Sequence, residues 1–156
     1  MKLKNLVMSI IATTTLSMAL TGDSISMKTT TFEEVIETKA GKEIKVLKVL
    51  EKAVPGDVVV YVNTITNPTN KKAEKLSVVN EVPEHTNFIA NSVKCDGCTI
   101  VYSVDGKEYQ SASKLFIKDN GVKRLAKAEE YSHIKFTLNT LSPKSEAKIQ
   151  FKTKIQ

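Results

Sequence analysis

The pair of cysteines in Cys95-Asp96-Gly97-Cys98 is the feature of this 156-residue chain with the clearest chemistry. Two cysteines at this spacing can exchange thiols and disulfides if a helix N-terminus stabilises the attacking thiolate and the second thiol resolves the mixed disulfide. Here strand-like sequence flanks the pair, and the carboxylate of Asp96 disfavours a thiolate. We therefore predict a structural disulfide between Cys95 and Cys98. A thiol–disulfide active protein with a labile, sensing bridge is the alternative.

The two histidines complete the list of residues with candidate chemistry. His85 lies in a predicted loop, and His133 alternates with apolar residues of a predicted strand. With the two cysteines they supply four zinc ligands, but histidines ten residues before and 35 residues after a Cys-x-x-Cys pair match no recognised spacing. Ser132 adjoins His133, so their side chains would point to opposite faces of a strand. We predict no metal site, no catalytic residue and no cofactor.

A row of lysines near the C-terminus could bind an anion. The side chains expected on the outer side of the last predicted strand are Lys144, Lys148, Lys152 and Lys154, joined by Lys135 if its strand is a neighbour. The formal net charge of +6 suits an anionic envelope polymer. Nucleic acid is a poor fit, because there is one arginine and no aromatic interleaving for base stacking. Lysines also protect exposed strands from aggregation, so we favour a solvated face and keep anion binding as the alternative.

The N-terminal sequence has the layout of a secretory signal peptide. Two lysines precede an uncharged stretch over 5–22, and the small residues of Ser17-Met18-Ala19 predict cleavage after Ala19. Cleavage at sites up to about residue 26 is an alternative, and so is a retained anchor, although the hydroxyl residues of the stretch make a mediocre membrane span. We expect 1–19 to be removed. The remaining protein would be periplasmic or extracellular, with no stable membrane anchor.

Alternation of apolar and polar residues runs through most of the remaining chain. In "YSHIKFTLNTL", Ile134, Phe136 and Leu138 alternate with polar residues, and "SEAKIQFKTKIQ" repeats the pattern. This period of two is typical of antiparallel strands with one buried face. Further strand-like segments, with turn signals such as Asp105-Gly106 and Asn120-Gly121 between them, indicate an all-β sandwich or barrel. We predict a single domain over 30–156.

Two segments depart from this pattern. "KEIKVLKVLEKA" places Ile44 and Val46 on one face and Leu47 and Val49 on the other. Apolar residues on both faces predict a strand that is covered on both sides or that switches sheets. "VKRLAKAEEY" is the one helical candidate, but it lacks a strong cap, so a single turn or a loop is the alternative.

A longer pattern carries a family resemblance. "VPGDVVVYVNTITNPTNKKAEKLSVVNEVPEHTNFIANSV" combines a Pro-Gly-Asp turn, a tyrosine-bearing strand ending in Asn, a strand leading to Val-Pro, and a Thr-x-Phe-Ile segment followed by Ser. The residues are Pro55-Gly56-Asp57, Tyr61, Asn67, Glu81-Val82-Pro83, Thr86, Phe88-Ile89 and Ser92. With "VYSVDG" and the last two strands, this resembles the bacterial immunoglobulin-like conserved repeat domain of unknown function, common in tandem in large surface proteins.

The resemblance spans about 52–155 and has three departures. Glu81 stands where the family usually has Asp, "SPKSEA" stands where it has a Gly-rich loop before the final strand, and the chain has one copy in place of an array. The family implies an immunoglobulin-like sandwich in an envelope or extracellular setting, and it has no agreed catalytic residues. We therefore expect an exported, non-enzymatic domain with a structural or protein-interaction role, whose partner is another envelope protein. Binding of an anionic surface component through the lysine face is the second hypothesis.

Overall fold

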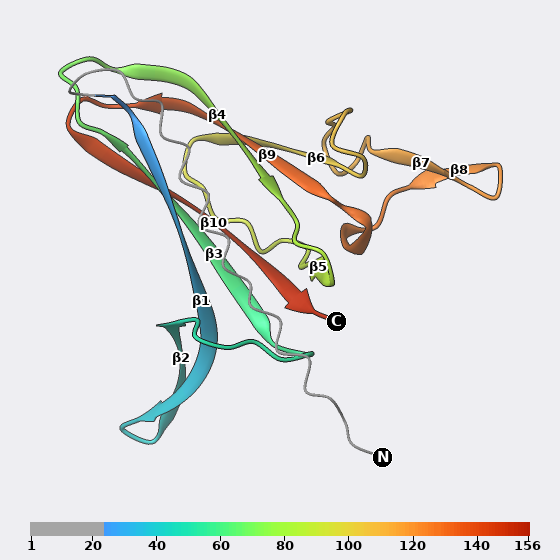
Figure 1. The fold of residues 1–156 in the computed structure, drawn as a ribbon, viewed down its shortest axis with the longest axis horizontal. Coiled ribbons are helices and arrows are strands. Elements are labelled where there is room, and N and C mark those ends of the chain that lie inside the picture. The colour runs from blue at the N-terminus through green and yellow to red at the C-terminus, as the bar shows by residue number, and fades with distance from the viewer. Residues whose placement is uncertain (1–23) are drawn as a thin grey trace.

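The computed structural model describes residues 24–156, so the predicted signal peptide at 1–19 lies outside the described part of the chain. In this described part, ten strands follow one another, and one short 3-10 helix lies between the eighth and the ninth (Figure 1). The elements are β1 (Ser26–Lys39), β2 (Lys42–Val49), β3 (Val58–Asn67), β4 (Ala73–Glu81), β5 (Thr86–Phe88), β6 (Cys98–Ser103), β7 (Phe116–Asp119), β8 (Val122–Leu125), η1 (Ala128–Glu130), β9 (His133–Leu141) and β10 (Ser145–Ile155). No helix within 24–156 has the length and apolarity to cross a membrane.

The strands form two facing antiparallel sheets and a small third one. Sheet A has the order β2-β1-β3-β10-β5, sheet B has the order β4-β9-β6, and β7 pairs with β8 alone. In Figure 1, β3 and β10 of sheet A and β4 and β9 of sheet B lie together at the upper-left end of the molecule and diverge toward the right. The prediction of an all-β, immunoglobulin-like antiparallel sandwich is confirmed. β1 begins at Ser26, a few residues before the predicted start of the domain.

The core lies between β3 and β10 on one side and β9 on the other. Alternate residues of these strands are buried, as the period of two predicts. The Tyr61 and Phe151 rings, on paired residues of β3 and β10, are stacked with their centroids 4.8 Å apart. Phe136 of β9 approaches Phe151 from the opposite sheet, at 6.2 Å between centroids. These contacts join the two sheets.

Two buried asparagines of β3 hold the sandwich together from within. The Asn67 amide donates to the carbonyl oxygens of Lys71, Ser142 and Leu141 at 2.8, 3.0 and 3.2 Å. Its oxygen accepts bonds from the backbone and hydroxyl of Thr69. Asn67 therefore ties the β3–β4 connection to the β9–β10 turn. Asn63, also on β3, donates to Asn80 on β4 at 2.8 Å and so links sheet A to sheet B.

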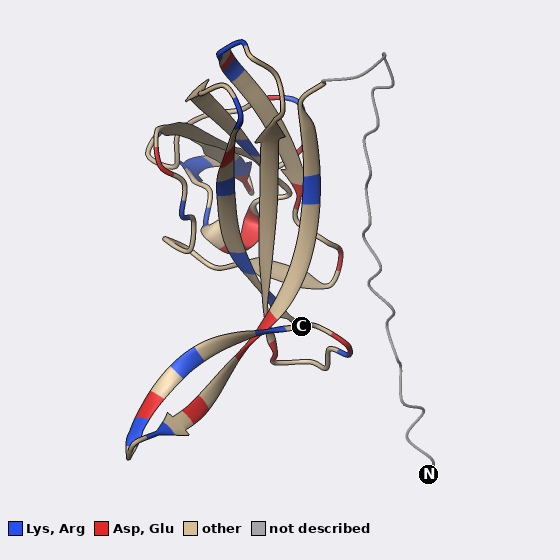
Figure 2. Cartoon of the chain, turned by 90° about the vertical axis from the view of Figure 1, so that its left-hand side faces the viewer, with Lys and Arg blue, Asp and Glu red and all other residues tan. Residues whose placement is uncertain are grey.

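Two hairpins project from this body. The second half of β1 and all of β2 extend away from the sandwich as one hairpin (Figure 2). The two-residue turn Ala40-Gly41, with φ of 50° and 75°, joins the two strands. The β7–β8 hairpin projects at a different end of the molecule, as Figure 1 shows. Its turn is the predicted Asn120-Gly121, with φ of 49° and 82°. We call these hairpins the first arm, residues 34–49, and the second arm, residues 116–125.

The sequence predictions for the irregular segments need correction. β2 stays in the sheet of β1 and has mostly exposed side chains, so it neither switches sheets nor is covered on both sides. The helical candidate over 122–131 divides into β8 and the single 3-10 turn η1, because its apolar residues pair with β7. Asp105-Gly106 does not form a tight hairpin turn between two strands. It lies in a longer loop, after which Gln110 pairs with Tyr102 through two backbone hydrogen bonds.

Candidate functional site

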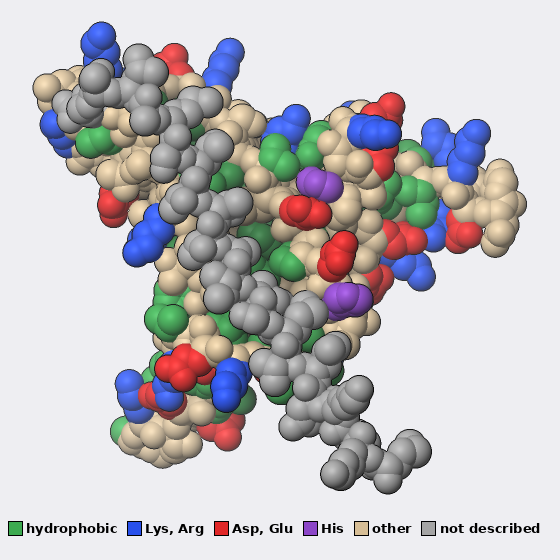
Figure 3. Space-filling view, viewed as in Figure 1, with side chains coloured by type: hydrophobic (Ala, Val, Ile, Leu, Met, Phe, Trp, Pro, Cys, Tyr) green, Lys and Arg blue, Asp and Glu red, His purple; other side chains and the backbone are tan. Residues whose placement is uncertain are grey.

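Exposed apolar side chains of the described residues gather on the two arms. Of the ten large apolar residues with exposed side chains in 24–156, seven lie there. The first arm carries Ile36, Ile44, Leu47 and Val49, and the second arm carries Phe116, Val122 and Leu125. Figure 3 shows both arms as outlying parts of the surface on which apolar and charged side chains alternate. Apolar groups that a domain leaves in water in this way mark surfaces that contact other molecules.

The first arm presents apolar residues on both of its faces. Cross-strand partners share a face, so the register of β1 with β2 assigns each side chain. Phe32 and Val49, Glu34 and Leu47, and Ile36 and Lys45 lie on one face, which continues the outer face of sheet A. The opposite face carries the pairs Val35 with Val46 and Glu37 with Ile44. Nothing in the sandwich packs against the end of this hairpin, which explains the exposure of both faces.

A chain of three charges fixes the base of the first arm. Glu34 accepts bonds from Lys152 of β10 and from Lys45 of β2, the latter at 2.7 Å. The hydrogen bonds from Lys152 and then from Lys45 hold the pKa of Glu34 below its usual value. On the opposite face Lys48 pairs with Glu37 at 3.0 Å. The arm is therefore a strand pair with defined charge positions, joined to the body through Lys152.

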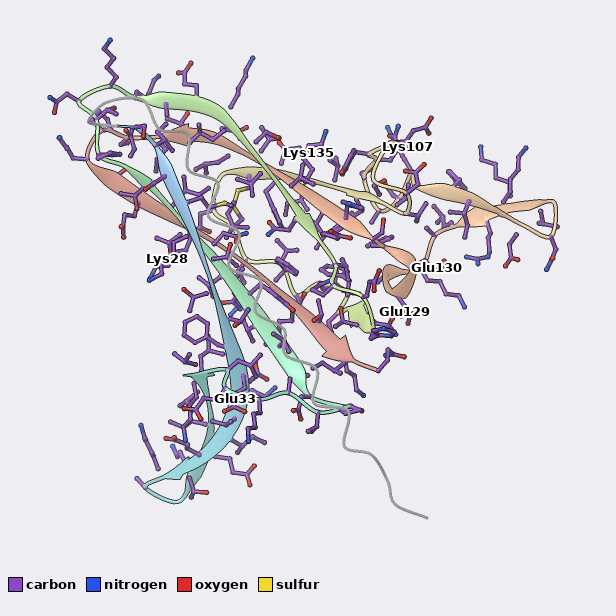
Figure 4. The ribbon with its side chains drawn as sticks, in the orientation of Figure 1. Lys28, Glu33, Lys107, Glu129, Glu130 and Lys135 are labelled. Carbon is purple, nitrogen blue, oxygen red and sulfur yellow. A yellow bond between two sulfur atoms is a disulfide. The ribbon has the colours of Figure 1, made fainter. Side chains whose placement is uncertain are left out.

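Arg124 holds the second arm against the body. Its guanidinium donates to both carboxylate oxygens of Glu130 at 2.7 and 2.8 Å, and its Nε donates to Asp119 at 2.9 Å. The bidentate bond from Arg124 lowers the pKa of Glu130 to about 2 and raises the pKa of the guanidinium. Figure 4 shows Glu130 where η1 meets the second arm. Lys123 covers the Phe116 ring, with Nζ 4.6 Å from its centroid.

Cys95 and Cys98 form the predicted disulfide, with their Cα atoms 5.7 Å apart. Lys94, just before the pair, exchanges backbone bonds of 2.8 and 2.9 Å with Gln150 of β10. Cys98 begins β6 in sheet B, and the Gly97 carbonyl accepts a bond from Asn139. The disulfide thus closes the turn at which the chain crosses from one sheet to the other. Strands flank it, and no described helix directs its N-terminus at either sulfur. Its redox role stays a prediction.

The structure divides the five predicted lysines between different places. Lys148 and Lys154 are exposed on the outer face of β10, and Figure 2 marks the basic positions along the ribbon in blue. Lys152 is paired with Glu34, and Lys144 donates to the Pro68 carbonyl oxygen. Lys135 lies on β9 in the other sheet, with Nζ 4.2 Å from the Tyr109 ring centroid (Figure 4). β9 is thus no neighbour of β10 in a sheet, and Lys135 does not join the row.

A different lysine shares the β10 face. Lys28 of β1 and Lys148 of β10 are both opposite Thr64 of β3, so they lie in one row across sheet A. Sequence reasoning missed Lys28 because the order of strands is needed to bring it there. Whether this row binds an anion stays a prediction.

The histidines stay apart. His85 occupies a turn with φ of 60°, and His133 makes a 2.8 Å hydrogen bond to Ser132 through Nδ1. Within 24–156, no group of three or more His, Cys, Asp or Glu side chains could hold a metal ion.

The arms are the feature that sequence reasoning missed. Their signal was the mixed pattern of β2, with Ile44 and Val46 on one face and Leu47 and Val49 on the other. Comparison with known proteins adds no further assignment, since no family model, curated protein or solved structure matches the chain. The resemblance to the immunoglobulin-like conserved repeat domain stays a prediction.

Proposed function

We propose that this chain is an exported, non-enzymatic domain of the bacterial cell envelope, periplasmic or at the cell surface, that contacts other proteins through its two arms. The observation that carries the proposal is the concentration of exposed apolar side chains on the arms. The signal-peptide pattern of 1–19 supports export. The family resemblance supports an envelope setting.

The physical argument is that the arms bury little within their own chain. Val122 keeps 67% of its surface exposed, and Ile36 and Val49 keep 63% and 62%. An isolated two-stranded hairpin is marginally stable in water, so a long one gains from a partner that covers it. Apolar residues surrounded by charged side chains are also the usual composition of a contact surface. Both arms have this composition, since ion pairs accompany the apolar residues on each.

A photo-crosslinking residue placed on each arm tests the proposal in the producing cell. Ile36 and Val122 are suitable positions, and Thr140, an exposed residue of sheet B, is the matched control. We expect protein adducts from the two arm positions in the envelope fraction and few from Thr140. Adducts of equal yield at all three positions, or a chain confined to the cytoplasm, would contradict the proposal.

A second candidate function is binding of an anionic envelope polymer. The row of Lys28 and Lys148, with Lys154 further along β10 on the same outer face of sheet A, favours it, since none of the three takes part in an ion pair within 24–156. Such binding would weaken steeply as salt is raised, whereas contacts of the apolar arms would not. Retention on a polyphosphate column at low salt, lost in Lys28→Glu and Lys148→Glu variants, would support it. Retention unchanged by both would exclude it.

A further inference from the structure

β2 is an eight-residue edge strand whose outer edge pairs with nothing in 24–156. Lys39 and Lys42 flank the two-residue turn, so they form a hydrogen-bonded pair, and bonded pairs recur at every second residue. The bond from Leu50 N–H to the Thr31 carbonyl at 3.1 Å fits this alternation. The outward N–H and C=O groups are therefore those of Glu43, Lys45, Leu47 and Val49. They form a ready template for another strand.

On the outer face of sheet A, a series of alternating charges ends at Lys45 of β2 without a carboxylate beyond it. Lys152 of β10, Glu34 of β1 and Lys45 of β2 alternate in sign toward the edge of sheet A, with β3 between β10 and β1, and all three side chains lie on the outer face. The next strand outward would continue the series if it placed a carboxylate opposite Lys45. β2 itself carries such a group at Glu43, which lies on the same face two residues from Lys45. A second copy of β2 can therefore complete the series, and the first can do the same for the second.

Symmetry limits how two copies can pair. Cross-strand partners share a face, so a twofold axis perpendicular to the sheet must lie midway between one residue of β2 and the same residue of the second copy. With Lys45 on the axis, lysine opposes lysine, and Lys42 opposes Lys48 as well. With Val46 on the axis, Ile44 opposes Lys48 and Glu43 opposes Val49. With Ile44 on the axis, Glu43 of each copy opposes Lys45 of the other, and the two Ile44 side chains meet. Charge complementarity selects this last register.

We propose that the occupant of this edge is a second copy of the chain, with β2 pairing antiparallel to β2 about a twofold axis at Ile44. The two first arms then form one four-stranded sheet with the order β1-β2-β2-β1. Glu43 and Lys45 of opposite copies exchange backbone bonds and also form ion pairs. The lysines that protect the edge from unrelated strands are thereby neutralised by the chain itself. This inference rests on the proposed function of the first arm as a contact surface.

Cysteine cross-linking tests the register on the full exported protein. The two native cysteines are closed in a disulfide, so an added cysteine on β2 is the one free thiol among 24–156. An Ile44→Cys variant should form a disulfide-linked dimer under mild oxidation, because the axis brings the two thiols face to face. The matched Val46→Cys variant, on the same face, should form little disulfide-linked dimer, because the axis places its two thiols far apart. A disulfide-linked dimer at Val46 in place of Ile44, or no disulfide-linked dimer in either variant, would overturn the proposal.

A charge exchange tests the pairing without cysteines. Glu43→Lys places lysine opposite Lys45, and Lys45→Glu places glutamate opposite Glu43, so each variant should associate with itself about tenfold more weakly than wild type. A mixture of the two variants should form a heterodimer, because every opposed pair is then of opposite sign. Lys39→Glu, a charge reversal on β1 away from the interface, should keep the wild-type dimer. Light scattering over a concentration series compares wild type with the three variants and with the mixture.

The outcomes separate this inference from the proposed function. Monomeric wild type, or a mixture that stays as weak as its components, would overturn the β2 pairing. Envelope cross-links from Val122 on the second arm would then leave the proposed function standing. Dimer formation with no arm cross-links to any other protein would keep the β2 pairing and restrict the function to self-association.

Discussion

β10 and β2 are built from similar residues, but the large apolar side chains of β10 are buried and those of β2 are mostly exposed. Both strands combine three lysines with large apolar residues, and both lie in sheet A. β10 buries Ile149, Phe151 and Ile155 against sheet B, whereas β2 leaves Ile44, Leu47 and Val49 in water. The strands differ in what lies across from them. β10 has a facing sheet, and β2 has left the sandwich with the end of β1.

This difference teaches how to interpret a period of two. In β10 the apolar residues lie on one face and the charged residues on the other, as expected for a strand between a core and water. In β2 both faces mix apolar and charged residues, and the strand has no core to face. Within this molecule, clean alternation accompanies the body and mixed alternation accompanies an arm. The energetic consequence is that truncations in the body should be costly and truncations in the arm should not.

The largest expected effect comes from Phe151→Ala in the body. Phe151 is 1% exposed and contacts both Tyr61 and Phe136, so its removal leaves a cavity between the sheets. We expect a loss of about 3–5 kcal/mol in the free energy of unfolding. The arm counterpart Leu47→Ala, 42% exposed, should change it by less than about 0.5 kcal/mol. Urea denaturation at a concentration where both proteins are monomeric measures the two values. Equal losses would contradict the division into body and arm.

Asn67→Ala should give the next largest effect, a loss of about 2–3 kcal/mol. The variant removes five hydrogen bonds and leaves the carbonyl groups of Lys71, Leu141 and Ser142 without their donor. Asn139→Ala, on the exposed side of β9, is the matched control and should be nearly neutral. Thermal melts of both variants provide the comparison. A neutral Asn67→Ala would show that water replaces the amide at no cost, and that the β3–β4 connection and the β9–β10 turn are held together by their remaining contacts, such as the bond from the Lys144 N–H to the Thr69 carbonyl oxygen.

Much of the body could be predicted from the sequence, because one buried face imposes a visible pattern. β3, β9 and β10 follow the predicted alternation, and the Cys95–Cys98 bridge is the one that spacing suggested. The role of Asn67 could not be predicted, since two of its partners lie 74 and 75 residues away. The position of Lys135 could not be predicted for a similar reason. β9 and β10 are joined by a short turn, yet they enter opposite sheets, which no local pattern records.

The arms could not be predicted because exposure depends on what the rest of the chain leaves uncovered. Apolar residues on both faces of β2 predict a strand that is covered on both sides or that switches sheets. In the structure, no other part of residues 24–156 covers either face of β2. The residues Ile36, Ile44 and Leu47 were therefore absent from the predicted site, and the lysines of β10 were present. Positions of charged residues were visible in the sequence, whereas the absence of packing around apolar ones was not.

The disulfide should contribute less than either body contact. Closing a loop of four residues removes little entropy from the unfolded chain, and the chain-entropy relation gives at most about 2 kcal/mol. We expect the Cys95→Ser and Cys98→Ser double variant to lose that amount or less while retaining the sandwich, as measured by urea denaturation. Its effect should exceed that of Leu47→Ala, because the bridge lies where the chain crosses between the sheets. A variant that unfolds entirely would show that the crossing depends on the bridge.

The smallest and most local effect is expected at the second arm, from Glu130→Gln. The pKa of Glu130 is lowered to about 2 by the bond from Arg124, so the unfolded arm binds a proton at a pH where the folded arm does not. The stabilisation is therefore complete above a pH of about 4.5, the ordinary value, and is lost as the pH falls through about 2. The variant should lower the hydrogen-exchange protection of β7 and β8 at pH 7, and the difference from wild type should shrink as the pH is lowered.

Glu129→Gln is the matched control for this last prediction, because the neighbouring carboxylate is exposed and takes no part in an ion pair within 24–156. It should leave the protection of β7 and β8 at the wild-type value. Protection of β3 and β10 should not change in either variant, because those strands open only when the sandwich unfolds. A loss of protection that extended into β3 and β10 would show that the second arm unfolds together with the body. The distinction between body and arm would then apply to the first arm alone, whose base is held by a single carboxylate, Glu34, between two lysines.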